Sequence, residues 1–79
     1  MRKIMLIGAG AGVSEEAVRA AFARIAPVEW VIIVRDGNPE LPLILVAADV
    51  SHIGVYDVLV RADGLSLAGK RVRAHAVLR

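Results

Sequence analysis

Basic side chains recur at every second position near the C-terminal end of the sequence. Arg71, Arg73 and His75 follow this spacing, and a β-strand places such residues on one of its faces. Lys3 belongs to the segment expected on the neighbouring strand. Because cationic side chains contact phosphates without reading a base sequence, this set predicts a surface for a polyanion such as a nucleic acid. A solvated edge strand, whose charges discourage aggregation, explains the same residues.

Glycine and alanine alternate after the first apolar run, at residues 8–12. Glycines spaced in a similar way form the phosphate-binding turn of dinucleotide-binding proteins, in which an acid such as Asp36 would bind the ribose. Val13 occupies the place of the third glycine, however, and the chain has too few strands for a doubly wound sheet. We therefore interpret the run as a flexible turn. A cradle for a small ligand, as in a ferredoxin-like regulatory domain, is the alternative.

Asp49, His52 and Asp57 gather near the expected start of one helix. An imidazole beside two carboxylates is a donor set for acid-base catalysis or for a metal ion. Helix capping and solvation explain the three residues more simply. The sequence has no cysteine and only two histidines, so we predict that the chain is not an enzyme and uses no metal or cofactor.

Apolar runs and polar–apolar alternation predict four strands, at residues 4–7, 28–34, 43–48 and 70–77. Ser14 has the side chain of a helix N-cap and predicts a helix over residues 15–26, which Pro27 ends. Ser51 predicts a second helix, which Gly64 ends. The resulting order, βαββαβ, predicts an α+β fold. This fold is a ferredoxin-like sandwich, with a four-stranded antiparallel sheet in strand order 4-1-3-2 and both helices on one face.

Several segments also resemble the RNA recognition motif (RRM) family. Residues 13–26 resemble its first helix, with Val18 and Phe22 as the core pair, and residues 28–36 follow at the usual spacing and end in the frequent Arg-Asp. Residues 62–74 are similar to the family's ending, in which a five-residue turn separates an Asn-Gly pair from a Gly-Arg-x-Ile-Arg-Val segment. The resemblance covers nearly the whole chain and implies an RRM-like domain that binds single-stranded RNA.

RRM proteins stack bases on aromatic side chains of the two central strands. By this resemblance the stacking position of the first strand holds Met5, and the two positions of the third strand hold Pro42 and Ile44. Glu40 stands where the family usually has a cation. Because the stacking rings are absent, we predict weak RNA binding that depends on basic residues and falls steeply with salt. The predicted RNA-binding residues are Lys3, Met5, Trp30, Ile44, Arg71, Arg73 and His75.

The open face of the predicted sheet is apolar. It carries Met5, Trp30, Ile32, Val34, Ile44 and Val46. An exposed apolar patch usually marks a protein interface, and the second strand lies at a sheet edge that favours pairing. A homodimer or another protein is therefore the alternative partner. The predicted interface comprises Trp30, Ile32, Val34 and Ile44.

A second apolar stripe, formed by Ile53, Tyr56 and Val60, falls on the outer side of the second helix. It indicates either a partner surface or a helix that is buried more deeply than the RRM pattern implies. The sequence alone leaves both interpretations open.

The composition is that of a folded domain. Hydrophobic residues make up 57% of the 79 residues and charged residues 23%, which excludes an intrinsically disordered chain. This length predicts one domain, over residues 1–79. The net charge of +2 permits a polyanionic partner without requiring one. No run reaches the roughly 18 apolar residues of a membrane span, and the lack of cysteine suits a reducing compartment, so we predict a cytoplasmic protein.

Overall fold

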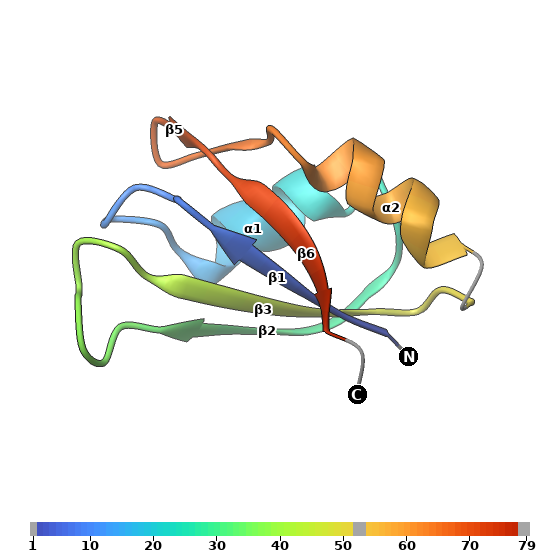
Figure 1. Ribbon diagram of the computed structural model, residues 1–79, viewed down its shortest axis with the longest axis horizontal. Coiled ribbons are helices and arrows are strands. Elements are labelled where there is room, and N and C mark those ends of the chain that lie inside the picture. Colours follow the sequence, from blue (N-terminus) through green and yellow to red (C-terminus); the bar gives the residue numbers. More distant parts are fainter. Residues whose placement is uncertain (1, 52–53, 78–79) are drawn as a thin grey trace.

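A computed structural model describes residues 2–51 and 54–77 of the chain (Figure 1). The helices and strands within these residues are, in chain order, β1 (Arg2–Ile7), α1 (Glu15–Phe22), β2 (Val28–Val34), β3 (Leu43–Ala48), α2 (Gly54–Ala62), β4 (Ser66–Leu67), β5 (Lys70–Arg71) and β6 (Arg73–Val77). Four of the strands form one sheet in the order β2-β3-β1-β6, and β4 pairs with β5 in a separate two-stranded sheet.

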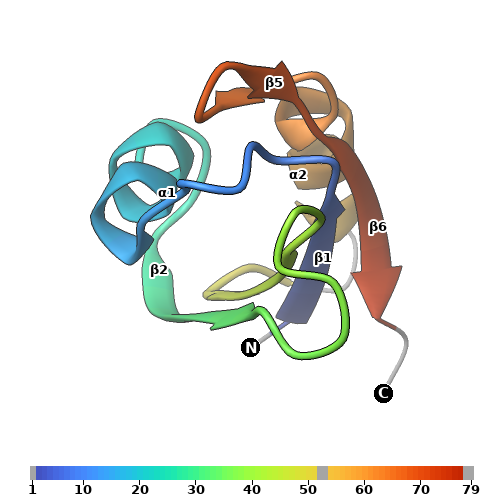
Figure 2. The ribbon, with the colours of Figure 1, turned by 90° about the vertical axis from the view of Figure 1, so that its left-hand side faces the viewer.

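The four-stranded sheet is antiparallel throughout. Both helices lie on one of its faces, with α1 packed against β2 and α2 against β6 (Figures 1 and 2). Since β6 corresponds to the predicted fourth strand, the observed order is the predicted order 4-1-3-2. The α+β, ferredoxin-like fold expected from the sequence is therefore confirmed.

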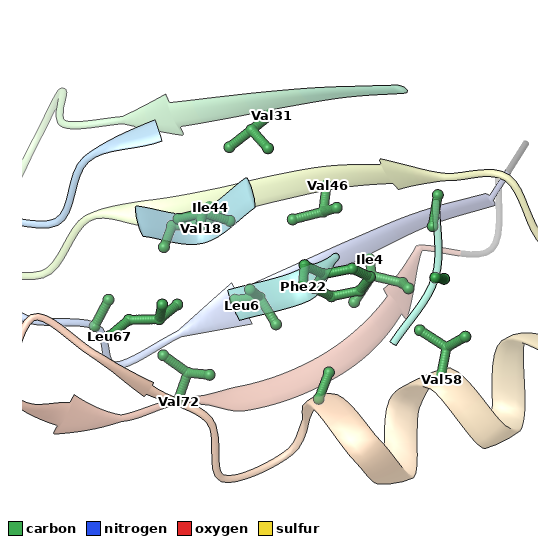
Figure 3. Packing of buried hydrophobic residues seen from close by; sticks show 14 of the residues in the cluster. Ile4, Leu6, Val18, Phe22, Val31, Ile44, Val46, Val58, Leu67 and Val72 are labelled. Atoms are coloured by element: carbon green, nitrogen blue, oxygen red, sulfur yellow. The ribbon is translucent and has the colours of Figure 1, made fainter. Parts of the chain in front are cut away.

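The core lies between the sheet and the helices. Alternate residues of a strand point to opposite faces, and in β1 the residues that face the helices are Ile4 and Leu6, both fully buried. From α1, Phe22 lies over Ile4 and Leu6 and Val18 lies over Ile44 of β3, and both helix residues are buried, as the helical spacing predicted (Figure 3). Burying a side chain of this size stabilises the folded state by about 1.5–3 kcal/mol. That is a large share of the roughly 4–12 kcal/mol expected for a domain of 79 residues.

Both predicted N-caps are present. The Ser14 hydroxyl accepts a hydrogen bond from the backbone N–H of Ala17 at 3.1 Å, and the Ser51 hydroxyl accepts one from Gly54 at 3.0 Å. The first helix, predicted over residues 15–26, ends instead at Phe22. The Phe22 carbonyl then accepts bonds from the N–H groups of both Ile25 and Ala26. Because Pro27 disfavours helical backbone at the residue before it, the chain leaves α1 through a tight turn.

The predicted strand over residues 70–77 is two strands, β5 and β6. Between them, the backbone N–H of Val72 donates to Leu65 at 2.9 Å and its carbonyl accepts from Gly64 at 2.8 Å. The backbone of Val72 is therefore bonded to the segment that follows α2. β5 pairs with β4 across Ala68 and Gly69, which have positive φ angles of 52° and 82°. Two such residues form the tight turn of a β-hairpin, which the sequence analysis did not predict.

Candidate nucleic-acid interface

The face of the sheet opposite the helices, called the open face below, is formed by three rows of side chains. Each row crosses the sheet from β2 to β6, because directly paired residues of neighbouring strands share a face. The central row is Ile32, Leu45, Met5 and His75; the rows beside it are Val34, Leu43, Ile7 and Arg73, and Trp30, Ala47, Lys3 and Val77.

Apolar and basic side chains occupy different parts of the open face. All the side chains from β2 and β3 are apolar, whereas Lys3 lies on β1 and Arg73 and His75 lie on β6. Ile32 is 48% exposed and Ile7 is 42% exposed. The open face is thus an apolar surface with a basic border along one side.

Ile44 does not belong to this face. Its side chain and that of Val46 are fully buried against the helices (Figure 3), so the prediction of Ile44 as an RNA-binding and interface residue is wrong. Pro42 is buried as well, and the outward positions of β3 hold Leu43 and Leu45. The register predicted for the third strand was therefore one residue too early. The RRM position assigned to Glu40 depended on that register and is wrong as well. The open face is apolar as predicted, because the residues found at these outward positions are leucines where isoleucine and proline were expected.

Ile7 is an open-face residue that the sequence analysis missed. Side chains alternate between the two faces of a strand, and Ile7 lies on the same face of β1 as Lys3 and Met5. This alternation within β1 was sufficient to predict the position of Ile7. In β3, by contrast, every residue from Leu43 to Ala48 is apolar. A run without polar residues does not show which of its side chains face outward. The sequence therefore contained no signal for the face of each residue in β3.

The predicted basic residues divide into two groups. Lys3, Arg73 and His75 lie on the open face. Arg71 belongs to β5, outside the four-stranded sheet, and its guanidinium lies about 4.0 Å from the place a Cβ on Gly64 would take. The prediction that Arg71 lines the same face as Arg73 and His75 is therefore wrong, because the chain changes sheets between β5 and β6.

Arg73 is partly neutralised by an acidic residue. Its Nε lies 3.2 Å from Oδ1 of Asp63, which also accepts a hydrogen bond from the backbone N–H of Ala74 at 3.1 Å. Both side chains of the ion pair are well exposed, so water and salt screen it and it adds little stability. Within residues 2–51 and 54–77, Lys3 forms no ion pair. Lys3 is thus the open-face cation with an uncompensated charge.

The glycine run is closed by other parts of the chain. The N–H of Gly10 donates to the Leu67 carbonyl at 3.0 Å, and a Cβ on Gly10 would lie 2.1 Å from the Ala68 carbonyl oxygen. The Arg35 guanidinium donates to the carbonyls of Ala11 and Val13. These contacts support the interpretation as a turn, since the Gly10 N–H that a ligand cradle would use is already bonded within the protein.

The remaining predicted clusters, both near α2, include residues that the structure does not describe. Asp57 pairs with Arg61 at 3.2 Å, His52 lies outside the described residues, and no group of three potential ligands for a metal ion is present among the others. On α2, Tyr56 is 59% exposed and Val60 76%. This exposure excludes the deeper burial of α2, while Ile53 lies outside the described residues. No described helix is long and apolar enough to cross a membrane.

Solved structures that match this fold include RRM domains. The second RRM domain of the yeast poly(U)-binding protein Pub1 matches the whole chain with a TM-score of 0.78 at 15% identity, over 96% of that domain's chain. The third RRM domain of Pes4 matches with a TM-score of 0.81 at 10% identity, over 94% of its chain. The RNA-binding protein PG1 matches with a TM-score of 0.78 at 11% identity, over 96% of its chain. No family model and no curated protein sequence matches this chain.

Proposed function

Because the chain has the fold of RRM domains, we propose that it is a nucleic-acid-binding module that binds single-stranded RNA weakly on its open face. One observation carries the proposal: Lys3, Arg73 and His75 lie on the same face as Trp30. Cations for phosphates and a ring for a base are the two components of single-strand binding without strong sequence preference.

Two rings of the open face are suited to stack bases, Trp30 and His75. They lie on β2 and β6, at opposite edges of the sheet. Three strand spacings of about 4.8 Å separate these edges, roughly 14 Å in total, so the two rings stack different bases. Met5 and Leu45 lie between them and offer apolar contact but no π-face. Since stacking contributes about 1–3 kcal/mol per base, the affinity is low.

Phosphate contacts then supply most of the binding free energy. Lys3 is the principal cation, because the charge of Arg73 is shared with Asp63. Lys70 and Arg71 are also exposed, but they lie on the β4–β5 hairpin outside the four-stranded sheet and do not belong to the open face. Phosphate contacts release counterions from the nucleic acid, and the affinity therefore falls as salt rises.

The salt dependence of RNA binding tests the role of Lys3. We expect Lys3→Ala to reduce the slope of log K against log salt by about 0.7, the value for one lost contact to a single-stranded phosphate. The measurement is a fluorescence anisotropy titration with random-sequence single-stranded RNA at several salt concentrations. Arg24→Ala is the matched control, because it removes one exposed positive charge near the end of α1, away from the open face.

An equal effect of Arg24→Ala and Lys3→Ala on the slope would contradict binding on the open face. NMR chemical shifts locate the contact independently, with perturbations expected on β1, β2 and β6. A folded protein that binds no RNA even at low salt would refute the proposed function.

A protein that covers the open face is the second candidate ligand. The exposure of Ile7 and Ile32 favours it, since neighbouring apolar side chains on a surface commonly mark a contact with another protein. Absence of RNA binding at low salt is the result that would favour this candidate.

A further inference from the structure

We propose that this chain forms a homodimer in which β2 of one copy pairs in antiparallel fashion with β2 of the other, with Ile32 opposite Ile32. The proposal goes beyond the proposed function and does not depend on it. Its basis is that residues 29–35 are self-complementary in apolar character and in charge in this one arrangement.

β2 is an edge strand that lacks the usual protection. In the described part of the chain it pairs with β3 only. Natural edge strands discourage pairing with lysine, proline or inward-pointing charges. Residues 30–34 contain none of these. Each of them is β-branched or aromatic, and residues of these types are favoured in β-sheets. The free edge is therefore competent to accept another strand.

The irregularity in β2 sets the centre of the pairing. The register with β3 shifts between Val28 and Trp30, and from there to Val34 it is regular. A bulge bends the strand and leaves one residue unpaired, so the regular stretch available at the edge is residues 30–34. Ile32 is the middle of that stretch. A two-fold axis through Ile32 places Trp30 opposite Val34 of the second copy and Val31 opposite Ile33.

Charged residues flank the regular stretch symmetrically. With Ile32 opposite itself, Glu29, the unpaired residue of the bulge, lies at the end of the regular stretch beside Arg35 of the other copy, and both residues are exposed. The Arg35 guanidinium is already held by the carbonyls of Ala11 and Val13, so the position of its charge is fixed. Opposite charges across neighbouring strands stabilise the pairing.

The neighbouring registers lack this match. Directly opposed residues of an antiparallel pair share a face, so the two-fold axis passes through a residue, and the nearest alternative centres are Val31 and Ile33. With Val31 at the centre, Glu29 lies opposite Ile33 and Arg35 opposite Pro27. With Ile33 at the centre, Arg35 lies opposite Val31. Each alternative leaves a charge opposite an apolar residue, which favours the register centred on Ile32.

Single cysteines map this register, because the natural chain contains none. Opposed residues of an antiparallel pair have Cβ atoms about 4.5–5.5 Å apart, close to disulfide geometry. Under mild oxidation we expect Ile32→Cys to form a crosslinked dimer about tenfold faster than Ile7→Cys, because pairing raises the local thiol concentration. Ile7 is the matched control, since it is similarly exposed on the open face but lies on β1, inside the sheet.

Two further experiments test the pairing of the flanking positions. A mixture of Trp30→Cys and Val34→Cys is expected to crosslink to each other faster than either does to itself. Glu29→Arg places like charges opposite each other and is expected to shift sedimentation toward monomer, while circular dichroism shows an intact fold.

Three results would overturn the dimer. The first is a natural chain that sediments as a monomer at the highest accessible concentration. The second is equally fast crosslinking of Ile7→Cys and Ile32→Cys, which indicates that two open faces pack together. The third is a set of crosslinks centred on another residue of β2.

Discussion

Aromatic rings introduced at Met5 and Leu45 are expected to raise the affinity for single-stranded RNA. The two side chains lie directly opposite each other at the middle of the open face, and both are half-buried. Met5→Tyr and Leu45→Phe each add a π-face outside the core. Stacking of about 1–3 kcal/mol per base corresponds to a roughly 5- to 150-fold gain for each ring. Anisotropy titrations at one fixed salt concentration measure this gain.

The control for these variants is a ring added elsewhere. Val60→Phe enlarges a side chain that is 76% exposed on the outer side of α2, and we expect it to leave RNA binding unchanged. If the folded double variant binds RNA no better than the natural chain, the open face is not the RNA site. If Val60→Phe raises the affinity equally, the gain is non-specific hydrophobic attraction.

A methyl group at Gly10 is expected to destabilise the domain strongly. The added Cβ would lie 2.1 Å from the carbonyl oxygen and 2.8 Å from the Cβ of Ala68, so the glycine run or the β4–β5 hairpin must move. Overpacking of this kind costs about 1–3 kcal/mol or more. For a domain of this size each kcal/mol lowers the melting temperature by about 4–8 °C. Thermal unfolding of Gly10→Ala followed by circular dichroism measures the change.

Gly12→Ala is the matched control for this prediction. A Cβ there meets nothing within 4 Å, and the backbone of Gly12 does not have a positive φ angle. The substitution restricts the unfolded chain and is expected to leave stability unchanged or to raise it by about 0.4–1 kcal/mol. Equal destabilisation by both substitutions would show that the run needs glycine for its flexibility and not for close packing.

The strands whose face could be predicted are those in which polar residues mark one side. In β6, Arg73 and His75 alternate with alanines, and in β1 Lys3 marks the outward phase. Both strands therefore carry a period-two signal. β3 carries none, and its register was inferred from a loop length that proved wrong by one residue. Hydrophobicity alone thus identified β3 as a strand but could not distinguish Ile44 from Leu45.

The other departures from the prediction come from contacts between distant segments. The end of α1 depended on how Ala26 and Pro27 return the chain to β2, and the apolar spacing continued past that point. The hairpin of β4 and β5 depended on Ala68 taking a left-handed backbone, which alanine rarely adopts. Arg71 left the predicted surface because this hairpin forms. Local sequence patterns do not report such tertiary contacts.

The position of β1 has a consequence for folding during synthesis. β1 lies between β3 and β6, with Lys3 opposite both Ala47 and Val77. While a ribosome has made only the part through β3, β1 exposes one whole edge and β2 exposes another. Unpaired edges of this kind recruit other chains. The hydrogen bonds that cover β1 form only after β6 emerges, so completion of the native sheet must wait until nearly all of this sequence has been translated.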